Sequence, residues 1–251
     1  MNKKSYVYGF HAVQSLLKTR PEKIIHLLAI KSHGESKLES ILQEAKAQHI
    51  SIEYINREKM DRLTETTHHQ NIAAYCVSQP PLNEQSLPNF LSNLSTQPLF
   101  LILDGVQDPH NLGACFRSAD AAKADAIIAP KDRAVSLTAV VSKVASGAAE
   151  TVPFFQVTNL VRSIEILKAQ GVWVYGADEK ASDVLFNTDL SGPVAIILGS
   201  EGKGLRRLTR EHCDGLIKIP MYGQVSSLNV SVAAGIVLFE VVRQRMERGR
   251  L

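Results

Sequence analysis

Short, almost wholly apolar runs alternate with helical segments in the second half of the chain. The apolar runs cover residues 99–103, 126–129, 172–177 and 194–198. Helical spacing is found near residues 111–123, 136–146 and 158–170. Strands that are apolar on both faces and separated by helices are typical of a parallel sheet covered on both sides. The pattern therefore predicts an α/β fold with a mostly parallel, doubly wound sheet, followed by a last helix at about 230–248.

The first 78 residues show shorter elements with a core of their own. Apolar residues recur at helical spacing in 12–17 and 37–48, whereas 24–30, 51–55 and 72–77 have strand patterns. Residues 79–98 contain four prolines among many Ser, Asn and Gln residues, which is typical of a linker, and a short helix near 89–94 interrupts it. We therefore expect a small α/β domain at 1–78, a linker at 79–98 and a larger domain at 99–251.

Composition narrows the class of protein without identifying its function. The formal charge of +3 permits a nucleic-acid partner but does not require one. No run of about 18 apolar residues is present, and the first residues lack the apolar segment of a signal peptide. Cys76, Cys115 and Cys213 are odd in number and far apart, as expected for reduced thiols. We therefore expect a cytoplasmic protein without a membrane partner.

A glycine-rich loop, Gly199-Ser-Glu-Gly-Lys-Gly204, follows the apolar run at 194–198. Its spacing departs from both the dinucleotide fingerprint G-x-G-x-x-G and the phosphate-binding G-x-x-x-x-G-K-[ST], so phosphate binding is poorly supported. Glycines can instead let an adenosine or methionine group lie against bare backbone. Taken alone, the loop is better explained as a tight turn in which Glu201 is a solvated helix cap.

Two further polar segments precede helical runs. Asn111 occupies a preferred N-cap position, and Arg117 lies about two turns further along. An amide and a guanidinium can stabilise a developing oxyanion or bind a phosphate. Near residue 230, Ser227 and Asn229 precede the last helix, and the apolar Leu228 between them could pack on a flat ring. Each segment, considered alone, is also explained by ordinary helix capping.

Other polar residues give weaker indications. His68 and His69 are adjacent and point apart, and the Cys and His spacings fit no zinc motif, so we expect no metal site. The arginines near the C-terminus are typical of a solvated helix end. Three arginines after the glycine loop either follow a nucleic-acid backbone or form a solvated helix face; they are Arg206, Arg207 and Arg210.

Taken in order, the motifs N-x-G-x-x-x-R, L-G-x-E-G-x-G and I-P-M-x-G-x-x-x-S-L-N-x-S-x-A are far more specific than any one of them. Over about residues 99–246 the chain resembles the SpoU (TrmH-like) family of RNA ribose 2′-O-methyltransferases within the SPOUT class. The front segment, from Tyr8-Gly-Phe-His-Ala-Val13 to His69-Gln70, resembles that family's L30e-like RNA-binding domain. It departs from the family at Asn71, where glycine is expected.

The resemblance implies S-adenosylmethionine as methyl donor, bound in a C-terminal trefoil knot, and a homodimer. Within the family the chain is most similar to enzymes that act on a guanosine of large-subunit rRNA. The substrate is then RNA and not DNA, because only RNA has a 2′-hydroxyl. The resemblance assigns catalysis to Asn111, Arg117, Glu201 and Asn229. It assigns the cofactor to Gly199, Ser200, Ile219, Ser227 and Leu228.

The chemistry of the implied reaction fits these residue types. The methyl donor is already activated, so the protein mainly positions the reactants and removes the hydroxyl proton. A guanidinium stays protonated in proteins, so we expect Arg117 to bind the neighbouring phosphate and to stabilise the emerging alkoxide, while Glu201 or a water takes the proton. A tRNA-directed enzyme of the same family and a non-catalytic RNA-binding module remain alternatives. A nucleotide-dependent oxidoreductase is disfavoured because G-x-G-x-x-G is absent.

Overall fold

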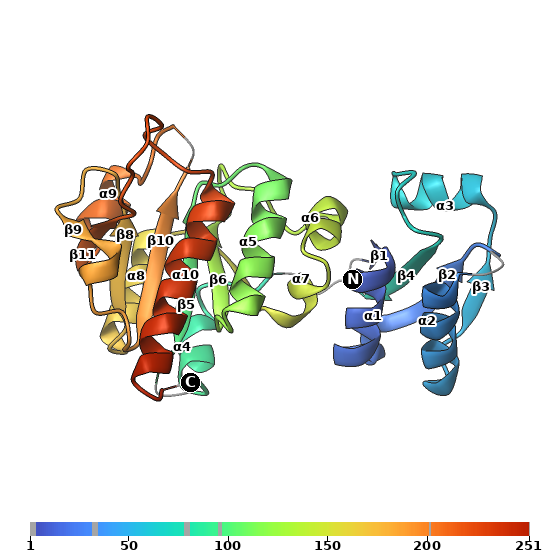
Figure 1. The fold of residues 1–251 in the computed structure, drawn as a ribbon. Coiled ribbons are helices and arrows are strands. Elements are labelled where there is room, and N and C mark those ends of the chain that lie inside the picture. The colour runs from blue at the N-terminus through green and yellow to red at the C-terminus, as the bar shows by residue number, and fades with distance from the viewer. Residues whose placement is uncertain (1–3, 32–34, 78–80, 95–96, 201, 251) are drawn as a thin grey trace. The chain divides into compact units, whose positions relative to one another are not determined.

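The computed structural model of the protein describes residues 4–31, 35–77, 81–94, 97–200 and 202–250. Its contacts divide the chain into two units (Figure 1): Met1–Pro80 with Leu137–Thr151, and Pro81–Ser136 with Val152–Leu251. This grouping differs from the domain boundaries expected from the sequence, because residues 137–151 pack with the first unit and residues 81–94 with the second. Each unit is therefore described by itself.

The first unit is built on a four-stranded sheet with the order β1-β4-β2-β3. β4 is antiparallel to both β1 and β2, and β3 is parallel to β2. The elements are β1 (Lys4–Tyr8), α1 (Phe10–Thr19), η1 (Pro21–Lys23), β2 (Ile24–Ala29), α2 (Ser36–Ala47), β3 (Ile52–Tyr54), α3 (Arg57–Thr64), β4 (Ile72–Val77), α6 (Ala139–Val144) and α7 (Ala148–Thr151).

Apolar side chains cover both faces of this small sheet. One face packs with α1 and α2 through residues such as Leu16, Leu27 and Ile41, and the other packs with α3 around Met60. The segment containing α6 and α7 joins α1, where the Ser15 hydroxyl donates to the Gly147 carbonyl at 3.2 Å. The sequence prediction of an α/β unit with its own core is therefore consistent with the contacts, although β1 and α3 were not predicted.

The second unit contains a seven-stranded sheet in which every pairing is parallel, with the order β7-β6-β5-β10-β8-β11-β9. This confirms the predicted mostly parallel sheet. The elements are α4 (Leu87–Leu91), β5 (Leu99–Asp104), α5 (Pro109–Ala121), β6 (Ala126–Pro130), β7 (Phe154–Val157), α8 (Leu160–Ala169), β8 (Trp173–Ala177), β9 (Asp183–Val184), η2 (Leu185–Asn187), β10 (Val194–Gly199), α9 (Arg207–Glu211), β11 (Gly215–Lys218) and α10 (Val230–Glu247).

Helices cover both faces of the parallel sheet. α5 and α10 lie side by side on one face, and α8 packs on the other with α4 and α9 (Figure 1). The core between the sheet and α8 contains Phe100, Ile128, Phe155, Ile164 and Ile197, each with no exposed surface. Burial of each such side chain contributes about 1.5–3 kcal/mol, which explains why the central strands are almost wholly apolar.

Part of the expected linker is folded against the second unit. Leu82 exchanges backbone hydrogen bonds with β7, accepting from Gln156 at 2.8 Å and donating to Phe154 at 2.9 Å. Leu87 at the start of α4 is fully buried in the core beside α8. Residues 78–80 and 95–96, which belong to the same expected linker, lie outside the described residues.

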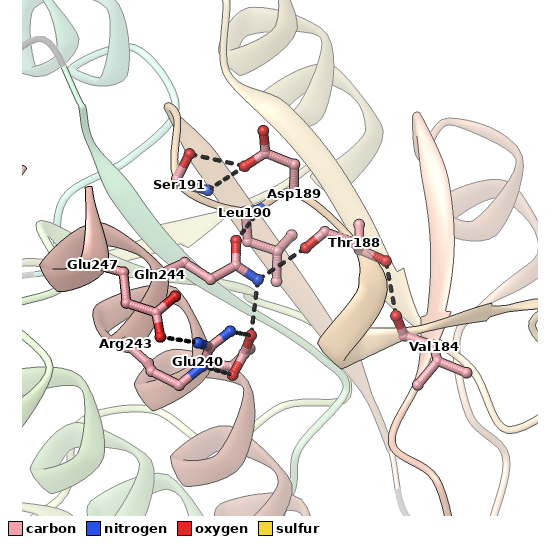
Figure 2. Close-up of polar contacts among 9 residues, drawn as sticks. All are labelled: Val184, Thr188, Asp189, Leu190, Ser191, Glu240, Arg243, Gln244 and Glu247. Carbon is pink, nitrogen blue, oxygen red and sulfur yellow. Dashed lines mark hydrogen bonds and ion pairs between the residues drawn. The ribbon is translucent and has the colours of Figure 1, made fainter.

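The last turns of α10 are fixed to the connection before β10 (Figure 2). Gln244 accepts from the Leu190 amide at 2.8 Å and donates to the Thr188 carbonyl at 2.9 Å and to Glu240 at 2.8 Å. Arg245 is buried and donates to the carbonyls of Pro98 and Gly192. The expectation of a solvated helix end holds for Arg243, Arg248 and Arg250, which are exposed. It was wrong for Arg245, which satisfies backbone carbonyls that the fold buries.

No helix within the described ranges has both the length and the apolar composition that crossing a bilayer requires.

Candidate active site

The site lies where the two central strands of the parallel sheet end. β5 and β10 pair in register along their length, so Asp104 and Gly199 lie opposite each other at their carboxyl ends. Loops that follow neighbouring parallel strands emerge at the same edge of the sheet, where α/β proteins usually bind their ligands. The segments singled out in the sequence after β5 and β10 therefore begin beside each other.

The glycine-rich loop after β10 folds back on itself. The Gly204 amide donates to the Ser200 carbonyl at 2.9 Å, and the Ser200 amide donates to the Gly204 carbonyl at 3.2 Å. A β-carbon on Gly199 would lie 2.2 Å from the Gly204 carbonyl carbon, so glycine is required by this close backbone approach. Glu201, to which a catalytic role was assigned, lies outside the described residues.

A buried carboxylate holds this loop to the end of β5. Asp104 is almost fully buried, accepts from the Arg206 backbone amide at 3.0 Å and lies 3.3 Å from the Arg206 Nε atom. A buried charge is tolerated because it is paired and hydrogen-bonded. Arg206 is therefore a structural residue as well as a cation at the edge of the site.

The other two arginines of this segment are also paired with carboxylates. Arg207 contacts Glu211 at 2.7 Å within α9, and Arg210 contacts Asp178 at 2.9 Å. All three side chains nevertheless keep substantial exposure. They do not form the uncompensated cationic face that the simplest RNA-tracking hypothesis would require.

Two asparagines from different helices meet at the site. The Asn229 side-chain amide donates to the Asn111 side-chain carbonyl at 3.0 Å, which joins α10 to α5. Asn229 is also the N-cap of α10, since its Oδ1 accepts from the Ser231 amide at 2.9 Å. The predicted N-cap role of Asn111 was wrong: Asp108 caps α5 by accepting from the His110 amide at 2.9 Å. Asn111 lies in the first turn of α5.

Two adjoining cavities lie beside the loops after β10 and β11. One, of about 470 Å³, is lined by Gly199, Ser200, Ser227 and Leu228. The other, of about 640 Å³, is lined by Ile219, Ser227 and Leu228. Together they form what we call the cofactor cavity, because all five residues assigned to the cofactor line at least one of them. This placement supports the assignment without testing it.

A third cavity, of about 580 Å³, adjoins the cofactor cavity at the glycine-rich loop and is here called the β5 cavity. Asn111 lines it, together with Gln107, Asp108 and Arg133. Arg117 is exposed on α5 and lines none of these cavities. The structure therefore brings Asn111, Asn229 and the cofactor residues together, but it does not bring Arg117 into this group within one chain.

Sequence reasoning missed several residues that line the cavities. Asp178 and Lys180 line both parts of the cofactor cavity, directly after β8. Their position after an apolar run at 172–177 was a usable indication, because ligand sites of parallel sheets lie at strand carboxyl ends. Arg133 follows β6 in the same way.

The thiols near the site are not suited to nucleophilic catalysis. Burial raises the pKa of Cys115 and of Cys213 to about 12, so both stay protonated at neutral pH. Within the described ranges, no group of three His, Cys, Asp or Glu residues is arranged to hold a metal ion. The side chains that the site does present include amides, which can form hydrogen bonds, and arginines, which can stabilise negative charge.

The loop before β4 in the first unit is fixed by its own side chains. The buried His69 bonds Asp61 at 2.8 Å through Nε2 and accepts from the Asn71 amide at 3.0 Å through Nδ1. Gln70 accepts from the Phe10 amide at 2.8 Å, which ties this loop to the start of α1. Asn71 has a φ of +59°, a left-handed conformation that asparagine tolerates. Its departure from the expected glycine therefore preserves the backbone of the loop.

Comparison with known families matches nearly the whole chain. Residues 98–239 match the SpoU rRNA Methylase family. Residues 6–82 match the family described as RNA 2′-O ribose methyltransferase substrate binding. The two matched segments follow the two regions identified from the sequence.

Curated relatives and solved structures agree with these matches. The chain is 53% identical to the 23S rRNA (guanosine-2′-O-)-methyltransferase RlmB of Shewanella oneidensis, over 98% of this chain and 99% of that protein. It is 48% identical to RlmB of Haemophilus influenzae, over 96% and 98%. The AdoMet-bound rRNA methyltransferase of Sinorhizobium meliloti is 25% identical, with a TM-score of 0.77 over 96% of this chain and 87% of that one. AviRb of Streptomyces viridochromogenes, crystallised with AdoMet, shares the fold at 22% identity, with a TM-score of 0.81 over 97% and 91%.

Proposed function

Because the chain belongs to the SpoU rRNA methylase family, we propose that it transfers a methyl group from S-adenosylmethionine to the ribose 2′-oxygen of a specific guanosine in 23S rRNA. The observation that carries this proposal is the near full-length similarity to RlmB proteins, which extends over both units. The site geometry agrees with it, since two cavities meet at Ser200, one beside the cofactor residues and one beside Asn111.

S-adenosylmethionine supplies an activated methyl group when it is bound. The residues that would hold it are Gly199, Ser200, Ile219, Ser227 and Leu228, which line the cofactor cavity. The bare backbone around Gly199 and the apolar Leu228 suit an adenosine group, because a flat ring packs against apolar atoms while backbone groups bond its edge. The trefoil knot implied by the family resemblance stays a prediction.

The catalytic roles are assigned by combining the motifs with the geometry. We propose that Asn111 and Asn229 orient the ribose, since their bonded amides lie at the joint of α5 and α10. Arg117 binds a neighbouring phosphate and stabilises the emerging alkoxide as a permanent cation. Glu201 or a water takes the hydroxyl proton.

A homodimer is the assembly that the exposed face of α10 supports. Val232, Phe239 and Met246 recur at intervals of seven residues and are 50%, 48% and 65% exposed. Such a stripe on one helix face suits packing against a second helix, and here the occupant is a second copy of the chain. A dimer could also supply Arg117 to the site of its partner. Sedimentation at the mass of a single chain, at micromolar concentration, would contradict this assembly.

The first unit is proposed to bind the RNA, as its family match suggests. We place the protein in the cytoplasm, with either free 23S rRNA or an assembling large subunit as its substrate. Cell fractionation that recovered the protein away from ribosomal particles and cytosol would contradict this placement.

The test of the function is methyl transfer mapped by nucleotide. Ribosomal RNA from a strain that lacks the protein is incubated with purified protein and labelled S-adenosylmethionine. We expect one new 2′-O-methylated guanosine in 23S rRNA. Label on tRNA alone would support the proposed methyl transfer but contradict 23S rRNA as its substrate. Absence of label on free RNA and on assembly intermediates, with S-adenosylmethionine still bound, would favour a non-catalytic RNA-binding module.

The catalytic assignments are tested in the same assay. Arg117→Lys keeps a charge but loses the planar fork, so we expect kcat to fall at least tenfold. Glu201→Gln removes the proposed base and should lower kcat similarly or more. Near-normal activity of the lysine variant would exclude a role that needs the guanidinium, and near-normal activity of the glutamine variant would assign the proton to water.

A further inference from the structure

The β5 cavity has a place in the site that neither the motifs nor the cofactor assignment explains. It lies between the segment after β5, the segment after β6 and the glycine-rich loop. It shares five lining residues with the cofactor cavity: Ser200, Lys203, Gly204, Leu205 and Val230. A molecule bound in the β5 cavity would therefore lie next to a molecule bound in the cofactor cavity, as a second substrate must.

Basic side chains outnumber acidic ones in the lining of this cavity. Four basic side chains line it: Arg133, Lys203, Arg206 and Arg207. Arg206 is compensated by Asp104 and Arg207 by Glu211. Arg133 and Lys203 are exposed and form no ion pair with a residue in the described ranges. Asp108 is the one described carboxylate that lines the cavity, and one of its oxygens is already used to cap α5.

The segment that carries Arg133 is held in place by several contacts. The Val135 amide donates to the Val106 carbonyl at 2.9 Å. Gln107 donates to the Arg133 carbonyl, and Arg206 donates to the Asp132 carbonyl, both at 3.4 Å. Arg133 itself has a φ of +57°, a conformation that costs free energy for a residue other than glycine. These contacts fix the backbone from which the Arg133 side chain extends, and a fixed backbone lowers the entropy lost when the segment binds an anion.

We propose that the β5 cavity binds a backbone phosphate of the RNA strand that flanks the methylated nucleotide, and that Arg133 and Lys203 hold this phosphate. The inference rests on the proposed function, since it identifies a contact of the same substrate. An arginine fork and a lysine ammonium are the usual partners of phosphate oxygens, and such contacts fix the position of the strand without reading its sequence. Arg133 is thus a positioning residue that aligns the strand with Asn111.

The test compares Arg133→Gln with Arg162→Gln, the same change at an exposed arginine on α8, away from the cavities. The substrate is an unmodified 23S rRNA transcript, and methyl transfer is measured at KCl concentrations from about 50 to 200 mM. For Arg133→Gln we expect KM for RNA to rise about tenfold, with kcat within twofold. The slope of log(kcat/KM) against log[KCl] should become less steep by about 0.7, and the dissociation constant of S-adenosylmethionine should not change. Arg162→Gln should match the wild type in all four quantities.

Lys203→Gln provides a second, independent variant if Arg133→Gln does not fold. It should show the same change in KM and salt slope. Wild-type KM and salt slope in both variants would overturn the proposal, as would a loss confined to kcat. Failure of the proposed function is recognised separately, because the wild-type protein would then methylate no RNA at all. In that case filter binding of the transcript at the same salt concentrations decides whether Arg133 still contributes a phosphate contact.

Discussion

The two ends of helix α10 carry similar polar residues in opposite environments. At its start, Asn229 is exposed and joins Asn111 beside the cavities. Near its end, Glu240 and Gln244 are at most 8% exposed; Gln244 bonds the connection before β10, and Glu240 accepts from Gln244 within the helix (Figure 2). Buried polar groups whose hydrogen bonds are made within the fold contribute to stability, whereas exposed amides at a cavity can exchange partners with a substrate. The comparison therefore predicts that changes at the two ends affect different quantities.

The largest effect on catalysis is expected for Asn229→Asp. A carboxylate still accepts from the Ser231 amide, so the helix cap is retained. It cannot donate to Asn111, and it places a negative charge opposite that carbonyl oxygen. We expect kcat to fall about 100-fold, equivalent to about 2.7 kcal/mol, with a midpoint of thermal unfolding within about 2 °C of the wild type. Steady-state methyl transfer and thermal unfolding measure the two quantities.

Asn159→Asp is the matched control for this prediction. Asn159 caps α8 in the same manner, accepting from the Arg162 amide at 3.1 Å, and lines none of the three cavities. It should leave both kcat and the unfolding midpoint unchanged. If Asn229→Asp kept wild-type kcat, the asparagine pair would only join α5 to α10. The proposal that the start of α10 takes part in catalysis would then be wrong.

The parallel sheet was predictable because its central strands are buried on both faces. Runs such as Leu99–Asp104 and Val194–Gly199 contain little besides large apolar residues. Short or polar elements were missed because they contain too few apolar residues to show a pattern. α3 has only Met60 and Leu63 as large apolar residues, and β11 has only four residues. Periodicity indicates an element only where burial on one face is strong enough to select the residues.

Single residues were predicted less well, because their roles depend on distant partners. Asp108-Pro109 was a better cap signal than Asn111, since proline is favoured at the first helical position, and this could have been found. The burial of Arg245 could not have been predicted from the sequence, because its acceptors Pro98 and Gly192 are remote in sequence. Likewise, nothing local links Arg206 to Asp104, which is 102 positions away. The three loops were linked by their resemblance to a family, and the fold explains how two of them begin side by side.

The second prediction concerns the structural end of α10. Gln244→Leu keeps a similar volume but removes one acceptor and two donated bonds, leaving the Leu190 amide and the Thr188 carbonyl without this partner. Unsatisfied buried backbone groups cost about 1–3 kcal/mol each, so we expect the free energy of unfolding to fall by about 2–4 kcal/mol. Urea unfolding followed by the fluorescence of Trp173, the single tryptophan, reports on this unit. The kcat of the folded fraction should stay within twofold.

Arg248→Gln is the control for the structural end. Its ion pair with Asp189 is largely exposed, at 46% and 61% for the two side chains, so its removal should cost less than about 1 kcal/mol. Equal losses in the control and in Gln244→Leu would mean that burial does not distinguish these contacts. A large loss of kcat in Gln244→Leu would mean that the two ends of α10 are coupled.

The smallest effect is a pH dependence at Glu240. Hydrogen bonds from Arg243 hold the pKa of this carboxyl below its ordinary value of 4.5, because they favour the charged form. A carboxyl with a lowered folded-state pKa contributes stability that is fully present above its unfolded-state pKa and is lost as the pH falls through the folded-state value. We therefore expect Glu240→Gln to be about 1 kcal/mol less stable than the wild type at pH 7 and to approach it below about pH 4.5. Urea unfolding of both proteins from pH 7 to pH 3.5 measures this difference directly, because the other carboxylates titrate equally in both. Curves that stayed parallel over this range would show that the charge of Glu240 is irrelevant, and that only the shape and the neutral hydrogen bonds of this side chain hold the end of α10.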